Sequence, residues 1–318
     1  MRSAKFLGLL VLTLAPWAHA EEEEVAVAAS TAAVASGPHD FASVNGQQGA
    51  GLSFSPEQKG RLYAELGFHT RSQENTFGGT TLNTSYTYVS WLLGGGYKIT
   101  PEVELEVIVP MGFYDTSTTA SASTDDFGDL SSSGLAIGNL HLGANWLKRA
   151  GAFRMKLGAA LEFGPWNSNP SADTVGALYG GLLVRSQHDS GLWLPETFSI
   201  VTPSHIEFGD DFVVTGDFGL GLHLSTGGAD PQISVQLDPG IGYYASKDAL
   251  LGVRLPIVAV PTSDSDDKAQ LAVEPFARVA IGSAFLNLRF TVNLDEPLGF
   301  AFDDGKVWAL HLGGGGSF

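Results

Sequence analysis

From about Lys59 to the last residue, apolar and polar side chains alternate in long, repeated runs. In one such run Leu286, Leu288 and Phe290 alternate with polar residues. A two-residue period is the spacing of a β-strand whose two faces meet different surroundings. The runs exceed the usual soluble strand of about 5–6 residues and suit a membrane-crossing strand of about 9–11 residues with extensions. This pattern favours an all-β fold and leaves little room for helices.

Connectors of two kinds separate the runs. The short ones are Thr100-Pro101, 148–151, 246–248 and 282–284. The longer, polar ones are 70–83, 115–131, 166–173, 261–267 and 297–304. Transmembrane β-barrels have this asymmetry, with short periplasmic turns and long outer loops. We therefore predict a closed antiparallel transmembrane β-barrel with an up-and-down meander.

Strand parity predicts the number of strands. The expected strands are 59–69, 84–99, 101–114, 132–147, 152–165, 174–186, 211–226, 231–245, 249–260, 269–282, 284–296 and 305–318. This makes about 12 strands, an even number as closed antiparallel barrels have, provided that 187–210 is one periplasmic connection. The stretch 192–201 also has strand character, so that 14 strands are the alternative.

The two faces of the expected strands differ in charge. One face carries both signs in mid-strand, and the other is almost free of charge. A cation facing lipid at mid-depth costs roughly 2–4 kcal/mol, and backbone groups in hydrocarbon must all be paired, which favours a closed sheet. Aromatic residues form two expected interfacial girdles at the strand ends. They are Tyr97, Trp146, Phe153, Tyr243, Phe285 and Phe318 beside the short turns, and Phe68, Tyr86, Phe113, Tyr114, Phe163, Trp166 and Phe302 beside the long loops.

The charged face supplies the candidate functional residues, which we expect to line the lumen. They are Arg61, Glu65, Glu102, Glu104, Glu106, Arg154, Lys156, Glu162, Asp217, Arg254, Glu274, Arg278 and Arg289. One interpretation is a charge-lined passage that orients a polar or ionic solute. The other is a mutually neutralised lumen that closes a narrow barrel with buried salt bridges. A barrel of this size lacks the wide channel of porins with about 16–18 strands.

Histidines and acidic clusters offer weaker signals. His141, His223 and His311 fall on the expected inner face of three strands, where we interpret them as ordinary polar residues, and we expect no metal site and no cofactor. Two acidic clusters on the expected outer loops lack calcium-loop spacing but could bind divalent ions that bridge lipopolysaccharide. They are Asp125, Asp126 and Asp129, and Asp264, Asp266 and Asp267.

No catalytic residue is expected. The sequence has no G-x-S-x-G elbow and no H-E-x-x-H motif. A hydrolase needs a nucleophile or activated water beside a histidine and an orienting acid. His69 near Glu65, at an expected outer rim, is the best starting point for such a site.

The N-terminal part has the composition of an export signal. Arg2 and Lys5 precede a short apolar core and the Ala18-His19-Ala20 cleavage pattern, so we expect residues 1–20 to be a signal peptide cleaved near Ala20. Residues 21–58 are expected to be a flexible periplasmic segment and 59–318 the barrel. The sequence has no cysteine and a formal net charge of −17, which exclude a disulfide framework and argue against nucleic acid as a partner.

Together, the export signal, the periodic strands and Phe318 after Trp308-Ala-Leu-His-Leu312 resemble Gram-negative outer-membrane β-barrels. In that class the barrel assembly machinery reads a C-terminal aromatic residue. The runs Tyr97–Pro110 and Gly138-Asn139-Leu-His-Leu-Gly143 are similar to the phenol-degradation-pathway-type transporter barrels, with Asn139 in place of their usual Asp.

The resemblance implies passage of small, often apolar molecules across the outer membrane and no catalytic residues. The expected partners are outer-membrane lipids and lipopolysaccharide, the assembly machinery through Phe318, and a small-molecule solute. Two alternatives remain: a structural or adhesive barrel with a blocked lumen that acts through acidic outer loops, and a hydrolase at the rim.

Overall fold

The computed structural model describes residues 41–42, 52–53, 58–77, 80–122, 126–164, 188–194, 196–227, 230–246, 248–262, 268–294 and 307–318. The predicted signal peptide, residues 1–20, lies outside the described residues. In the predicted periplasmic segment two short strands, β1 (Phe41–Ala42) and β2 (Leu52–Ser53), pair antiparallel with each other.

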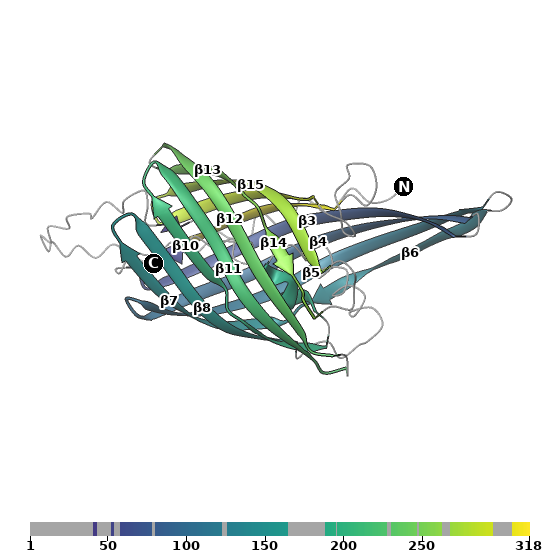
Figure 1. Cartoon of the computed structure of the whole chain (residues 1–318), viewed down its shortest axis with the longest axis horizontal. Helices are drawn as coiled ribbons and strands as arrows, with labels where there is room; N and C mark the ends of the chain where they lie inside the picture. The colour runs from purple at the N-terminus through teal and green to yellow at the C-terminus, as the bar shows by residue number, and fades with distance from the viewer. Residues whose placement is uncertain are drawn as a thin grey trace, which may run out of the picture. The chain divides into compact units, whose positions relative to one another are not determined.

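Antiparallel strands build the barrel wall (Figure 1). In chain order they are β3 (Gly60–Phe77), β4 (Thr80–Thr100), β5 (Val103–Ala122), β6 (Asp126–Ile137), β7 (Leu140–Ala150), β8 (Phe153–Phe163), β9 (Thr197–Val201), β10 (Ser204–Gly209), β11 (Phe212–Ser225), β12 (Gln232–Ser246), β13 (Ala249–Arg254), β14 (Ile257–Ala259), β15 (Ala269–Ile281), β16 (Ala284–Asn293) and β17 (Trp308–Ser317). Three crossings are interrupted, so β6 continues as β7, β9 as β10 and β13 as β14. The described residues therefore form a closed barrel of 12 crossings.

The seam that closes the barrel joins its first and last strands. β17 pairs antiparallel with β3, from Trp308 opposite Thr70 to Ser317 opposite Arg61. Beyond this ladder, the amide of Phe318 donates to the carbonyl of Gly60 over 2.8 Å. Because β17 pairs with β3 and the crossings pair with one another around the wall, the predicted closed meander is confirmed.

The sixth crossing differs from the prediction. The predicted strand 174–186 lies outside the described residues, and the interpretation of 187–210 as one periplasmic connection is wrong. That range holds a short 3-10 helix, η1 (His188–Trp193), followed by β9 and β10, which cross the wall between β8 and β11. The alternating pattern of β9 and β10 is broken at Thr202-Pro203. Each half is therefore shorter than the alternating run expected of a membrane-crossing strand. The count of 12 holds because this crossing replaces the expected one.

Two of the expected outer loops are instead extensions of strands. The range 70–83 continues the β3–β4 ladder to Phe77 opposite Thr80, and much of 115–131 continues the β5–β6 ladder to Ser121 opposite Asp126. Figure 1 shows these four strands projecting beyond the other strand ends. Both faces of the extensions are polar, so the alternation that marks a membrane strand is absent. Threonine, which is abundant there, favours strand backbone.

Tight turns join the strands at the opposite end. Those at 101–102, 151–152 and 282–283 follow the prediction, whereas the turn at 210–211 between β10 and β11 was missed. Gly151 and Gly282 adopt φ values of 59° and 61°, a backbone conformation that favours glycine. Among the described residues, no helix has the length and apolarity required to cross a bilayer.

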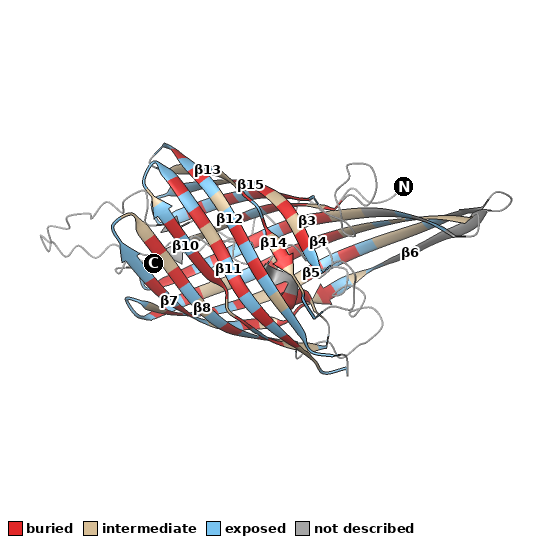
Figure 2. Cartoon of the chain, viewed as in Figure 1, coloured by how far each residue is buried: buried red, intermediate tan, exposed pale blue. Residues whose placement is uncertain are grey.

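The two faces of the wall separate apolar from polar residues. Figure 2 shows buried and exposed positions alternating along the strands. Exposed apolar side chains cover the outer face, with Leu220 59% and Leu288 46% exposed, as a bilayer-facing surface requires.

Most of the described girdle aromatics reach the outer face. Tyr97, Trp146, Tyr243, Phe318, Phe68 and Phe113 are exposed, and Tyr86, Phe153 and Phe163 are half-buried. The girdle assignment is wrong for Phe285 and Tyr114, which are buried inside the barrel because their strand positions share the inward parity. Trp166 and Phe302 lie outside the described residues.

Candidate functional site in the barrel interior

The inner face of the wall holds nearly all the charged residues that the sequence analysis singled out. Twelve of them are at most 5% exposed: Arg61, Glu65, Glu104, Glu106, Arg154, Lys156, Glu162, Asp217, Arg254, Glu274, Arg278 and Arg289. Their direction follows from strand alternation, since on β5 Leu105 is 49% exposed between the inward Glu104 and Glu106. Glu102 does not join them. It lies in the turn at 101–102 with its side chain 55% exposed, and its Oε1 lies 3.3 Å from Lys148 Nζ.

Arg61 on β3 organises one part of the interior. Its guanidinium binds Glu104 through two bonds, Nε to Oε2 at 3.0 Å and Nη2 to Oε1 at 2.8 Å, and reaches Glu106 Oε1 at 2.6 Å. The amide of Asn145 on β7 donates to Glu104 Oε1 at 3.1 Å and to Glu106 Oε2 at 3.0 Å. Lys156 Nζ on β8 lies 3.8 Å from Glu106 Oε2. Such two-pronged, charge-assisted contacts fix both partners in place.

A glycine on β4 makes room for this cluster. Gly96 stands opposite both Arg61 on β3 and Glu106 on β5. A side chain at Gly96 would overlap the carboxylate of Glu104 and the guanidinium of Arg61. The ion pairs therefore span β4 only because residue 96 has no side chain.

A second run of ion pairs follows the wall from β3 to β11. Glu65 Oε1 accepts from Arg289 Nη2 at 2.6 Å, and Arg289 Nη1 donates to Glu274 Oε2 at 3.2 Å. Glu274 also pairs with Arg254, and Arg254 Nη1 donates to Asp217 Oδ2 at 2.8 Å. Each arginine thus bridges two carboxylates from different strands, which ties β3, β16, β15, β13 and β11 together.

The run continues on β10 through two residues that the sequence analysis missed. Asp217 pairs with His205, whose Nε2 lies 3.8 Å from Glu207 Oε2, and Glu207 pairs with Arg154 on β8. These two residues were overlooked because 187–210 was interpreted as a connection. The alternation in Ser204-His-Ile-Glu-Phe208 was the signal that could have found them.

These contacts form two networks on the inner wall, the Arg61 cluster and the run from Glu65 to Arg154, which share strands β3 and β8 and are here together called the charge belt. Its members are Arg61, Glu65, Glu104, Glu106, Arg154, Lys156, His205, Glu207, Asp217, Arg254, Glu274 and Arg289. Five Lys and Arg side chains face six carboxylates, so the belt is close to neutral. The burial and pairing fit the neutralised interpretation of the lumen, with the charged groups largely shielded from bulk water.

The predicted histidines lie inside the barrel in separate settings. His141 Nδ1 lies 3.0 Å from Glu162 Oε1, and His311 Nδ1 lies 3.0 Å from Glu65 Oε1. His223 lies between two serine hydroxyls on neighbouring strands. Within the described ranges, no group of three histidine or acidic side chains is arranged to hold a metal ion.

His69 does not occupy an exposed rim. It is fully buried, its Nε2 lies 2.9 Å from Ser90 Oγ, and its ring packs edge-on against His311 with 4.9 Å between centroids. Glu65 binds His311 instead, and His69 Nδ1 has no hydrogen-bond partner among the described residues. Among the residues that the structure describes, no acid orients this Ser–His pair as a hydrolase requires.

The connection between β8 and β9 sends a short segment into the barrel. Residues 188–194, here called the inner segment, comprise η1 and Leu194. Leu192 and Trp193 are at most 1% exposed, and Trp193 packs edge-on against Tyr88 with 5.3 Å between ring centroids. Three carbonyls of the segment accept hydrogen bonds from Asn139: those of Gly191 and Leu194 from Nδ2 at 2.8 and 2.9 Å, and that of Leu192 from the backbone amide at 2.6 Å.

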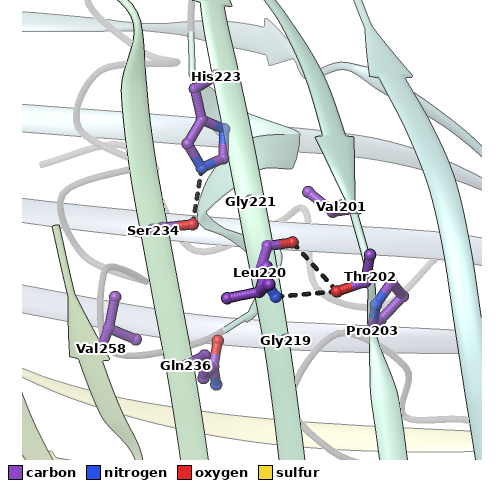
Figure 3. A pocket seen from close by; sticks show the side chains of 10 residues that line it. All are labelled: Val201, Thr202, Pro203, Gly219, Leu220, Gly221, His223, Ser234, Gln236 and Val258. Carbon is purple, nitrogen blue, oxygen red and sulfur yellow. Dashed lines mark hydrogen bonds between the residues drawn. The ribbon is translucent and has the colours of Figure 1, made fainter. Parts of the chain in front are cut away.

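A small pocket opens in the wall near the inner segment (Figure 3). It has a volume of about 20 Å³, space for about one water molecule. The lining residues are Val201, Thr202, Pro203, Gly219, Leu220, Gly221, His223, Ser234, Gln236 and Val258. Gly219 and Gly221 line it without side chains, and His223 Nε2 and Ser234 Oγ, 2.9 Å apart, form its polar side.

Comparison with solved structures places this geometry among known folds. The barrel is similar to the COG4313 outer-membrane channel from Pseudomonas putida F1, with a TM-score of 0.50 and 14% identity over 82% of this chain and 96% of that one. The fold is that of an outer-membrane β-barrel.

Two further solved barrels match this chain at lower scores. The translocator domain of the autotransporter NalP from Neisseria meningitidis has a TM-score of 0.46 and 12% identity, over 82% of this chain and 89% of that one. The Ralstonia pickettii toluene transporter TbuX has a TM-score of 0.38 and 8% identity, over 82% and 90%. No family model and no curated protein matches the sequence.

Proposed function

We propose that the protein is an outer-membrane channel or facilitator for small molecules. The charge belt is the observation that carries this proposal. Replacing buried ion pairs by well-packed apolar residues is often neutral or stabilising, so stability alone does not explain an interior built from them. A polar interior supports solute passage, and the paired, buried belt corresponds to a closed, neutralised state of the lumen that must open for a solute to pass.

The dimensions of the interior limit the solute. Twelve crossings enclose less space than the roughly 16–18 strands of wide porins, and the belt side chains and two residues of the inner segment are buried inside it. The proposed solutes are therefore small molecules, either apolar or small ionic ones.

The outer face and the export signal complete the proposal. The exposed apolar residues of the outer face would contact outer-membrane lipids and lipopolysaccharide. The signal peptide would be cleaved near Ala20 before the barrel forms. Phe318 would be read by the barrel assembly machinery, and its side chain is 67% exposed at the end of the seam, where such a partner can reach it.

Reconstitution tests the proposal. The purified, folded barrel should give single-channel current in planar bilayers and should admit small solutes into vesicles, with heat-denatured protein as the control. A folded barrel that carries no current and admits no solute would refute a channel role.

A second candidate, a structural or adhesive barrel, is favoured by the projecting strands of the β3–β4 and β5–β6 hairpins. Shortening both hairpins to the length of the other crossings removes this surface and leaves the charge belt intact. Loss of cell-surface binding with unchanged conductance would support adhesion as a separate role. Unchanged binding would exclude the hairpins as the adhesive part.

A further inference from the structure

We propose that Asn139 is the latch of a movable gate, and that the inner segment is the gate. The gate acts on the passage proposed above and therefore rests on that proposal.

The wall is interrupted where the latch lies. β5 pairs with β6 up to Met111 opposite Ile137 and resumes with β7 at Ile108 opposite His141, which leaves Gly138, Asn139 and Leu140 between the two ladders. The amide of Asn139 is therefore available to the inner segment and donates to Leu192. A side chain at Gly138 would overlap the carbonyl of Leu192, so this break in the wall is shaped to receive the segment.

The chemistry of the latch is specific to asparagine. Nδ2 donates both its hydrogens, one to Gly191 and one to Leu194. A carboxylate has no hydrogen to donate and would place negative charge against two carbonyl oxygens. Asn139→Asp therefore keeps the shape of the side chain, but an ionised carboxylate repels the two carbonyl oxygens that the amide of Asn139 binds.

The inner segment can leave without breaking the barrel. The belt joins wall strands by ion pairs, whereas the segment is held by neutral hydrogen bonds to Asn139 and by the packing of Leu192 and Trp193 in a buried apolar cluster of the wall that includes Tyr88. None of the strand ladders includes residues 188–194. Its departure would thus open the interior while the wall stays paired.

The segment also covers part of the polar interior. A side chain at Gly191 would overlap the Glu162 carboxylate and contact the ring of His223, which lines the pocket of Figure 3. Release of the segment would therefore expose both groups and enlarge that pocket toward the lumen.

A cysteine reporter measures the release directly, because the chain has no cysteine of its own. Leu192→Cys places a thiol in the segment at a fully buried position. A sulfonated, membrane-impermeant maleimide is added to intact cells, and folding of each variant is checked by its resistance to SDS before heating. We expect Asn139→Asp to raise the labelling rate at least tenfold relative to Leu192→Cys alone.

Asn287→Asp is the matched control, since Asn287 is another buried asparagine, on β16, and makes no hydrogen bond to the described residues 188–194. It should leave the labelling rate unchanged. Gly191→Ala provides a second route, because its added methyl group overlaps Glu162 and should also speed labelling. Equal labelling with and without Asn139→Asp, or an equal rise with Asn287→Asp, would overturn the latch.

Conductance of the same variants separates the two proposals. If Asn139→Asp speeds labelling but no variant carries current or solute, the latch stands and the channel proposal fails. If the unmodified barrel conducts and Asn139→Asp changes neither labelling nor conductance, the channel stands and the gate proposal fails. A higher open probability in Asn139→Asp together with faster labelling supports both.

Discussion

Arg289 and Glu65 lie 224 residues apart in the chain and form a buried ion pair of 2.6 Å across β17. Arg289 also binds Glu274 on β15 at 3.2 Å. One guanidinium thus neutralises carboxylates on both sides of the closing seam. Its removal should therefore destabilise the assembled barrel more than the removal of an exposed ion pair.

Arg289→Met should lower the free energy of unfolding by about 3–5 kcal/mol, because it leaves two buried carboxylates without this partner. Urea unfolding of the barrel in detergent micelles measures the change. Arg149→Met, at an exposed position near the end of β7, should change it by less than about 1 kcal/mol. Equal effects of the two variants would contradict the structural role of the belt.

The orientation of the outer face predicts a dependence on depth. Leu288 is 46% exposed in the middle of β16, and Ile281 is 63% exposed beside the turn at 282–283. Leu288→Arg should destabilise the barrel in lipid vesicles by about 2–4 kcal/mol, and Ile281→Arg by about 0–1 kcal/mol. Both can be measured by chemical unfolding of the reconstituted protein. The same loss at the two positions would mean that lipid does not cover this face as proposed.

The turn glycines allow a test of backbone strain without a clash. Gly151 has φ 59°, and no atom lies within 4 Å of a side chain built there. Gly151→Ala should cost about 1–2 kcal/mol through the left-handed backbone alone, and Gly151→Asn less, since asparagine tolerates this conformation. Thermal unfolding of the two variants gives the comparison, and an alanine variant as stable as the unmodified protein would disprove the strain.

The belt predicts a change of ion selectivity if solutes pass along it. Replacing both Glu104 and Glu106 by Gln leaves Arg61 and Lys156 without the carboxylates that neutralise them. The reversal potential in a salt gradient should shift toward anion preference. Gln at Glu102, which is exposed in a turn, should shift it far less. An unchanged potential in the double variant would place the ion path away from these residues.

The sequence predicted the barrel well because three of its features indicate the same architecture. These features are the alternation of apolar and polar residues, the restriction of charge to one strand face and the difference between short and long connectors. A residue such as Glu106 can face only the interior when its neighbours Leu105 and Val107 are exposed, so its burial was accessible from spacing alone. The inward direction of the lumen candidates within the strands therefore needed no three-dimensional information, whereas Glu102, in the turn before β5, does not follow the alternation.

The missed features have local physical causes. β9 and β10 were overlooked because the break at Thr202-Pro203 shortened the alternating run below the length expected of a membrane strand. The strand extensions were interpreted as loops because their sequences are polar at both alternating sets of positions. The contacts of Asn139 with the inner segment join residues more than 50 positions apart, and no local pattern reports such a pairing.

The seam between β3 and β17 has a consequence for biogenesis. Its two edges come from opposite ends of the barrel sequence, so the earliest strand to be translated waits with an unsatisfied side until the last one arrives. Until β17 pairs, the partly folded sheet exposes the open hydrogen-bonding edge of β3, which is a template for aggregation. We therefore expect folding of this chain to require that the edge of β3 be shielded until β17 is in place.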